Sequence, residues 1–335
     1  MVSRLILSIL MFVTPLARAE DAFERRPLIF PKDGFGLCYG PYRAGQQPGG
    51  AAPSRAQLRE DVRILSKHCE MIRVYGAGHF AGDLLDIIKE EKSSLKVLLG
   101  GWLNQEAIYD QEGKLVKTHE GVREKNAMEL ATLIALADAH RESVVAVLVG
   151  NETQVEWSDH RIHPKTLIGH IRDVRSQVAV PVTTGDDFNF WNKDRSREVA
   201  AEVDFITIHL YALWNGALMD VALDWTKSEY QSAKNFHPQI PVVVGESGWA
   251  TSKADTGLQG RLMKEKAGPE QQVKFLEQLF PWLKAEHVPV FYFSAFDEPW
   301  KSGEDTAGAE GHWGLFKEDR TSKAAAVRLL ELRSE

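Results

Sequence analysis

Eight short apolar runs recur along the chain, and amphipathic segments separate them. Each run is rich in β-branched residues and hardly alternates with polar ones, which is typical of strands buried on both faces. These runs cover residues 35–39, 71–75, 95–99, 144–149, 180–184, 205–210, 240–244 and 288–293. Apolar positions at helical spacing, several of them after a capping Ser or an early Pro, predict helices between the runs. The predicted helices are 54–67, 83–92, 121–140, 163–178, 225–235, 269–286 and 321–332, with a weaker one at 195–202.

Strand and helix therefore alternate along the whole chain. This order predicts a parallel sheet with helical crossovers, and eight repeats favour a single (β/α)₈ TIM barrel of the α/β class over an open, doubly wound sheet. The first strand is followed by Gly40-Pro41-Tyr42, which is not the glycine-rich loop of a nucleotide-binding sheet. Two domains are not expected, because no Pro-, Gly- or Ser-rich linker interrupts the pattern.

The first residues have a different character. Arg4 precedes an apolar stretch over residues 5–16, and Ala17-Arg18-Ala19 has the small-x-small pattern of a cleavage site. We interpret residues 1–19 as a secretory signal peptide and residues 20–335 as one catalytic domain, exported to the periplasm or the medium. The alternative is an N-terminal membrane anchor, although the apolar stretch is short for a span.

Charge narrows the range of partners. The net charge is −7, and basic clusters of the kind that bind phosphates are missing, so we expect no nucleic-acid partner. No stretch after the signal peptide predicts a membrane span, and we expect a monomer. The two cysteines, Cys38 and Cys69, fall at different heights on neighbouring predicted strands, too far apart for a disulfide.

Two glutamates follow two of the apolar runs, in Val149-Gly150-Asn151-Glu152 and in Gly245-Glu246-Ser247-Gly248-Trp249. In a (β/α)₈ barrel the chemistry lies at the carboxyl ends of the strands, so both side chains should face one cavity. Two carboxyl groups on either side of a bond can hydrolyse a glycoside, and a pair about 5–5.5 Å apart is typical of retention of configuration. The plainer interpretation is that each Glu merely begins an exposed loop.

The other residues predicted at this rim are mostly aromatic or acidic, which suits the flat faces and hydroxyls of sugars. They are Tyr39, Tyr75, Trp102, Asn151, Asp186, Tyr211, Trp249, Asp297 and Glu298. Trp191, Trp214 and Trp300 are either sugar platforms or buried aromatics. The spacing of the histidines matches no zinc motif, and His209 lies inside a predicted strand, so we expect neither a metal nor an organic cofactor.

In its motifs the chain resembles glycoside hydrolase family 17, the β-1,3-glucanase family within a clan of retaining (β/α)₈ glycosidases. The similarity spans almost all of residues 20–335 and is strongest with bacterial and fungal members. The matching motifs are Cys38-Tyr39-Gly40, Arg73-Val74-Tyr75, Gly150-Asn151-Glu152, Gly245-Glu246-Ser247-Gly248-Trp249, Phe296-Asp297-Glu298-Pro299-Trp300-Lys301 and His312-Trp313-Gly314-Leu315-Phe316.

The resemblance implies roles for these residues. Glu246 would be the nucleophile and Glu152 the acid/base of a retaining β-1,3-glucan hydrolase. The substrate-binding residues would be Tyr39, Tyr75, Trp102, Asn151, Tyr211, Trp249, Glu298 and Lys301. Three alternatives stay open: a β-1,3-glucanosyltransferase with the same covalent intermediate, a related enzyme acting on β-1,4-glucan or galactan, and an inactive glycan-binding barrel. Endo or exo action cannot be read from these motifs.

Overall fold

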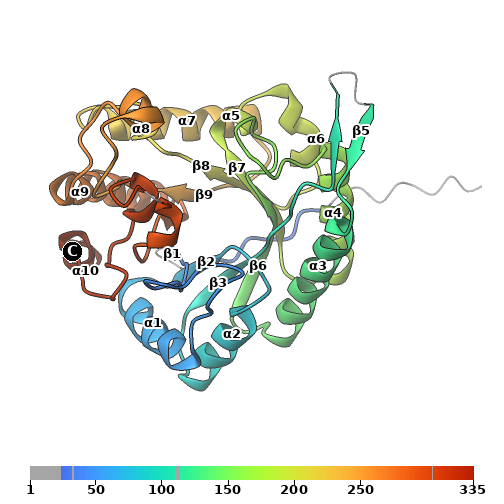
Figure 1. Cartoon of the computed structure of the whole chain (residues 1–335), viewed down its shortest axis with the longest axis horizontal. Coiled ribbons are helices and arrows are strands. Elements are labelled where there is room, and N and C mark those ends of the chain that lie inside the picture. Colours follow the sequence, from blue (N-terminus) through green and yellow to red (C-terminus); the bar gives the residue numbers. More distant parts are fainter. Residues whose placement is uncertain (1–23, 32–33, 111–113, 304) are drawn as a thin grey trace, which may run out of the picture.

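Eight parallel strands close into a barrel in the computed structural model, which describes residues 24–31, 34–110, 114–303 and 305–335. The order around the barrel is β1-β10-β9-β8-β7-β6-β3-β2 (Figure 1). The prediction of a single (β/α)₈ barrel is confirmed, whereas the predicted signal peptide lies outside the described residues. The strands are β1 (Phe35–Cys38), β2 (Met71–Val74), β3 (Lys96–Gly101), β6 (Val144–Asn151), β7 (Val182–Asp187), β8 (Ile206–His209), β9 (Val242–Ser247) and β10 (Val290–Tyr292).

Helices surround the barrel and cover the outer face of its strands (Figure 1). Local sequence explains where two of them begin: Ser54 and Gln57 form a capping box at the start of α1, and Pro164 opens α4. The helices between the strands and at the end of the chain are α1 (Arg55–His68), α2 (Ala81–Glu90), α3 (Val122–Ala139), α4 (Pro164–Gln177), α6 (Arg197–Ala200), α7 (Ala222–Phe236), α9 (Pro269–Glu286) and α10 (Ala324–Ser334). Among the described residues no helix combines the length and apolar character needed to cross a membrane.

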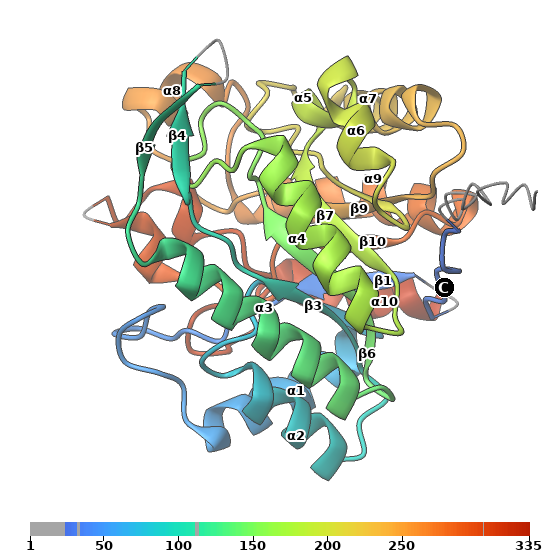
Figure 2. The same ribbon diagram turned by 90° about the vertical axis from the view of Figure 1, so that its right-hand side faces the viewer.

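Several small elements interrupt the strand-to-helix connections, and the sequence pattern did not predict them. An antiparallel hairpin, β4 (Ala107–Tyr109) and β5 (Leu115–Thr118), stands out from the body between β3 and α3 (Figure 2). The other additions are α5 (Phe188–Trp191), α8 (Gly257–Leu262) and the 3₁₀ turns η1 (Asp194–Ser196), η2 (Pro299–Ser302) and η3 (Ala309–Gly311). These connections lie at the end of the barrel where active sites form.

The strands are buried almost throughout, as their β-branched composition requires. Cys38 pairs in register with Arg73, so Cys69 lies four residues further back along the neighbouring strand direction. Both thiols are buried and unpaired, which confirms that expectation.

Candidate active site

Glu246 lies near the end of β9, with its side chain almost fully buried in the barrel mouth. Glycine precedes it for a steric reason: a Cβ at Gly245 would lie 2.2 Å from Cγ2 of Thr207 on β8. Any larger residue would separate β9 from β8 or rotate the carboxylate away. The local sequence thus holds Glu246 in one position.

Three side chains donate hydrogen bonds to the Glu246 carboxylate. Nη1 of Arg73 and the hydroxyl of Tyr75 reach Oε1 at 2.8 and 2.9 Å, and the hydroxyl of Tyr211 reaches Oε2. Burial by itself would raise the pKa of the Glu246 carboxyl, but the nearby His209 and Arg73 side chains and the two phenol hydrogen bonds outweigh it. The net pKa is lowered, so Glu246 is an ionised carboxylate at neutral pH.

Glu152 follows β6 directly and has a backbone φ of 48°. This left-handed conformation is uncommon for a residue with a side chain and is found mostly at functional sites. The amide of Glu152 donates to the carbonyl of Gly185 at 2.7 Å and so ties the bend to β7. The side chain of Glu152 is 27% exposed, in contrast to buried Glu246.

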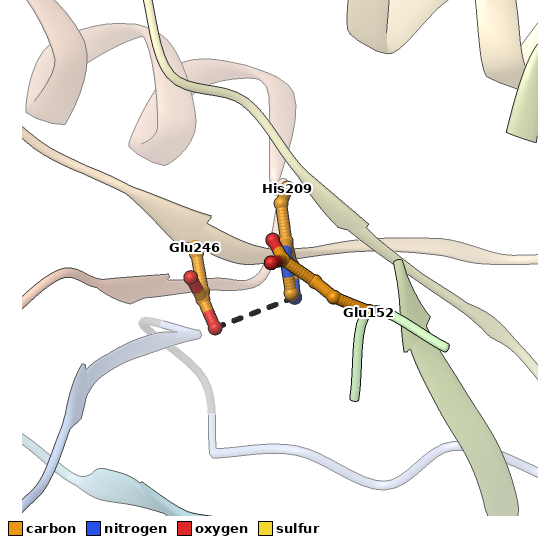
Figure 3. A group of neighbouring side chains, drawn as sticks. All are labelled: Glu152, His209 and Glu246. Atoms are coloured by element: carbon orange, nitrogen blue, oxygen red, sulfur yellow. Dashed lines mark hydrogen bonds and ion pairs between the residues drawn. The ribbon is translucent and has the colours of Figure 1, made fainter. Parts of the chain in front are cut away.

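His209, at the end of β8, lies between the two carboxylates (Figure 3). Its Nδ1 is 2.8 Å from Oε1 of Glu152, and its Nε2 is 3.5 Å from Oε1 of Glu246 and 3.1 Å from Nη1 of Arg73. In the neutral form of the imidazole, Nε2 accepts from Arg73, because the N–H groups of Arg73 can only donate, and Nδ1 then donates to Glu152. The histidine that lies inside a predicted strand therefore joins both glutamates.

The facing atoms of Glu152, His209 and Glu246 all lie within 4.8 Å of one another. Such a cluster can attract a metal ion, but here the guanidinium of Arg73 already donates to two of its three members. A positive protein group thus already neutralises part of the cluster's negative charge. The arrangement fits proton transfer and nucleophilic attack better than metal binding.

Most of the other residues that the sequence predicted at the rim line one cavity of about 1190 Å³ together with both glutamates. These are Tyr39, Tyr75, Trp102, Asn151, Tyr211, Glu298 and Lys301. Asn151 accepts a hydrogen bond from Arg73, and Lys301 forms an ion pair with Glu298 inside the cavity. Tyr39 is fully buried and its hydroxyl donates to Asp61, so it supports the wall of the cavity.

Trp249 does not belong to this set, and its prediction as a sugar-contacting residue is wrong. The residue is 0% exposed and is not among the residues that line the cavity. Its indole packs against Phe275 of α9 and donates to the carbonyl of Lys266. The ring therefore packs in the layer between the barrel and α9.

Among the remaining candidates, Trp214 and Trp300 line the cavity, whereas Trp191 is fully buried and does not. Asp186 is fully buried and accepts hydrogen bonds from the Gln154 and Asp187 amides. Asp297, also buried, pairs with Lys323 on the way to α10. Neither aspartate lines the cavity.

The sequence analysis assigned no individual role to three further residues at or beside the cavity. Arg73 is buried, and a charged residue within a buried strand is a usable signal, because such a charge needs an internal partner. Glu310 in η3 accepts from Nε1 of Trp214, and burial raises the pKa of its carboxyl against the opposing effect of Lys301. Trp157, in the loop after β6, also lines the cavity, and no pattern marks it or Glu310.

Comparison with known proteins agrees with this geometry. The model of the "BtgE/BtgC glycoside hydrolase domain" matches residues 36–314. A glucan 1,3-beta-glucosidase of Arthroderma benhamiae is 26% identical over 294 residues, which is 83% of this chain and 86% of that protein. A Schizosaccharomyces pombe protein of the same name is 24% identical, with 78% of each chain covered. The chain covers only 40% of the length of a relative in Aspergillus niger.

Solved structures show the same fold. An endo-laminarinase from Formosa Hel1_33_131 superposes with a TM-score of 0.75 at 23% identity, covering 89% of this chain and 87% of the other. A glycoside hydrolase family 17 beta-1,3-glucanosyltransferase from Rhizomucor miehei superposes with a TM-score of 0.69 at 22% identity, covering 88% and 97%.

Proposed function

The chain belongs to the BtgE/BtgC glycoside hydrolase domain family, which confirms the assignment to glycoside hydrolase family 17, and we propose that it is a retaining β-1,3-glucan hydrolase. One observation carries the mechanism: one carboxylate oxygen of Glu152 and one of Glu246 lie within 4.8 Å of each other in one cavity. Facing oxygens this close suit a retaining pair, whose carboxyl groups lie ~5–5.5 Å apart, better than an inverting pair at ~6.5–9.5 Å, which must leave room for a water molecule.

In the first step, the ionised carboxylate of Glu246 attacks the anomeric carbon of the sugar. Glu152 donates its proton to the glycosidic oxygen, the C–O bond breaks, and the leaving sugar departs as an alcohol. The product is a glycosyl ester on Glu246. The lowered pKa of Glu246 supports this role, because a nucleophile must be deprotonated.

In the second step, Glu152 is a carboxylate and takes a proton from water as the water oxygen attacks the anomeric carbon. The ester bond breaks, and Glu246 leaves as a carboxylate. His209 donates to Glu152 from Nδ1 and so stabilises its ionised form, which this half-reaction requires. Asn151, which accepts a hydrogen bond from Arg73, would bond the hydroxyl next to the anomeric carbon.

The names of the relatives support β-1,3-glucan as the substrate, since two of them are glucan 1,3-beta-glucosidases. The aromatic and acidic lining of the cavity fits a sugar chain, although no single residue visibly selects the linkage. The glucanosyltransferase alternative stays open, because a solved neighbour with the same fold carries that name. An inactive glycan-binding barrel is less favoured, since binding alone does not need two glutamates that are each held by hydrogen bonds from neighbouring side chains.

The experiment is to incubate residues 20–335 with laminarin, barley mixed-linkage glucan and carboxymethyl-cellulose, and to measure reducing ends and product lengths over time. We expect release from laminarin first and little from carboxymethyl-cellulose. Faster release of reducing ends from carboxymethyl-cellulose than from laminarin would overturn the assignment of a β-1,3 linkage. No release from any glucan would favour the binding barrel, and products longer than the substrate would favour transfer. Export remains a further proposal, which N-terminal sequencing of the secreted protein would test.

A further inference from the structure

Trp157 is a large apolar side chain that stays open to solvent inside the cavity. It is 61% exposed, and the only other tryptophan with a prominently exposed side chain among the described residues is Trp300. Both line the cavity. An indole that lines a cavity without being packed presents a flat apolar surface to whatever enters it.

The loop that carries Trp157 is tied to the acid/base residue. Trp157 follows Glu152 by five positions in the connection from β6 to α4. The amide of Ile162 donates to the carbonyl of Thr153 at 3.0 Å, which closes the loop on itself. Nε2 of His160 lies 2.8 Å from the carbonyl of the last β6 residue, so the loop is fixed to the strand end. The loop that carries Trp157 is therefore held beside the strand end that leads into Glu152.

A second aromatic belongs to the same wall. The ring of His160 packs on Trp102, with 4.6 Å between ring centroids, so the loops after β3 and β6 are in contact. Asn189, in the connection after β7, lines the cavity as well; its Nδ2 donates to Asp187, and its amide oxygen can accept from a hydroxyl. Since β3, β6 and β7 are neighbours in the barrel, these side chains form one side of the cavity.

The reaction determines which part of the substrate lies on this side of the cavity. The acid must reach the glycosidic oxygen, and the nucleophile attacks the anomeric carbon from the opposite face. The leaving sugar therefore lies toward Glu152. The sugars of the covalent intermediate lie toward the far side, where Trp300 and Tyr42 line the cavity on the connections after β10 and β1.

We propose that Trp157, with Trp102 and Asn189, binds the glucosyl unit that leaves in the first step and the acceptor glucosyl unit in transfer. The apolar face of the pyranose packs on the Trp157 indole, and the amide of Asn189 bonds ring hydroxyls. Trp157 is then a specificity residue for the leaving side of the cavity. This assignment rests on the proposed function, because it uses the roles of Glu152 and Glu246.

The test compares two substrates that share the sugars of the intermediate and differ in the leaving group. Laminaripentaose places sugars on the leaving side, whereas the leaving group of β-laminaribiosyl fluoride is a fluoride ion, which is too small to touch Trp157. For Trp157→Ala we expect kcat/KM on laminaripentaose to fall about tenfold, the order of one aromatic stacking contact, with fluoride release nearly unchanged. Transfer from the fluoride to added laminaribiose should fall in parallel, and Trp157→Phe should recover most of both activities.

Tyr109→Ala is the matched control. Tyr109 is also an exposed aromatic and packs on His163 of the same loop at 4.6 Å, but it does not line the cavity. Tyr109→Ala should leave both kcat/KM on laminaripentaose and the rate of fluoride release unchanged. Equal losses on both substrates with Trp157→Ala, or no loss on either, would overturn the assignment while leaving the proposed function intact. If the wild-type protein cleaves neither substrate, the proposed function fails and this assignment fails with it.

Discussion

The hydrogen bond from Tyr211 to the Glu246 carboxylate offers the sharpest test of how the site keeps its nucleophile ionised. Tyr211→Phe removes one hydroxyl and leaves the ring, which packs against Phe293 and Trp313. The hydroxyl of Tyr75 and the guanidinium of Arg73 still reach the other carboxylate oxygen. The substitution therefore isolates one donor.

The size of the effect follows from the charge on the acceptor. A hydrogen bond to an ionised group contributes roughly 1.5–3 kcal/mol. Because about 1.36 kcal/mol corresponds to one pH unit, the pKa of Glu246 should rise by about one to two pH units in the variant. The direction is fixed: the phenol stabilises only the carboxylate form, so its loss favours protonation. Activity is lost on the acid side as pH falls through this pKa.

We therefore expect the acid limb of the kcat/KM profile to move to higher pH by about that amount. The assay is kcat/KM on laminari-oligosaccharides across the acid and neutral range. Tyr230→Phe is the matched control, since its hydroxyl donates to the carbonyl of Val242 at the start of the same strand, away from the cavity. An acid limb that stays in place or moves to lower pH in Tyr211→Phe would refute the reasoning.

Two further predictions concern the glutamates and the glycine beside them. With azide and an activated aryl β-glycoside, Glu152→Ala should give a β-azide product and Glu246→Ala an α-azide product, as nuclear magnetic resonance would show; reversed configurations would exchange the two roles. Gly245→Ala should lower kcat/KM on laminarin about a hundredfold, because a Cβ 2.2 Å from the Thr207 side chain must displace the nucleophile. The control Gly169→Ala, exposed in α4 with no atom within 4 Å of the new Cβ, should raise Tm slightly and leave kcat/KM unchanged; equal activity in the two variants would contradict the steric argument.

Much of the fold was predictable because its elements have strong local signals. A strand buried on both faces reads as a continuous apolar run, and a crossover helix carries its own caps and periodicity. All eight predicted strands occur, displaced by at most a few residues. The hairpin β4–β5 escaped because its exposed strands are short and have no clear alternation.

The active site likewise has features that the sequence predicted and features that it did not. Glu152 and Glu246 were found because each stands at the end of an apolar strand, and in a parallel barrel every such end faces the same mouth. The pairing of Arg73 with Glu246 was not predictable: the two residues are 173 positions apart on strands that are not neighbours, and only closure of the barrel brings them together.

Trp249 and Trp157 show the same division at single residues. Each follows a catalytic glutamate by a few positions, yet Trp249 is buried against α9 and Trp157 lines the cavity. The sequence determined which strands end in carboxylates. The direction of each side chain beyond those ends depends on the turns that the loops make and on the helices they meet, so only the tertiary structure decided it.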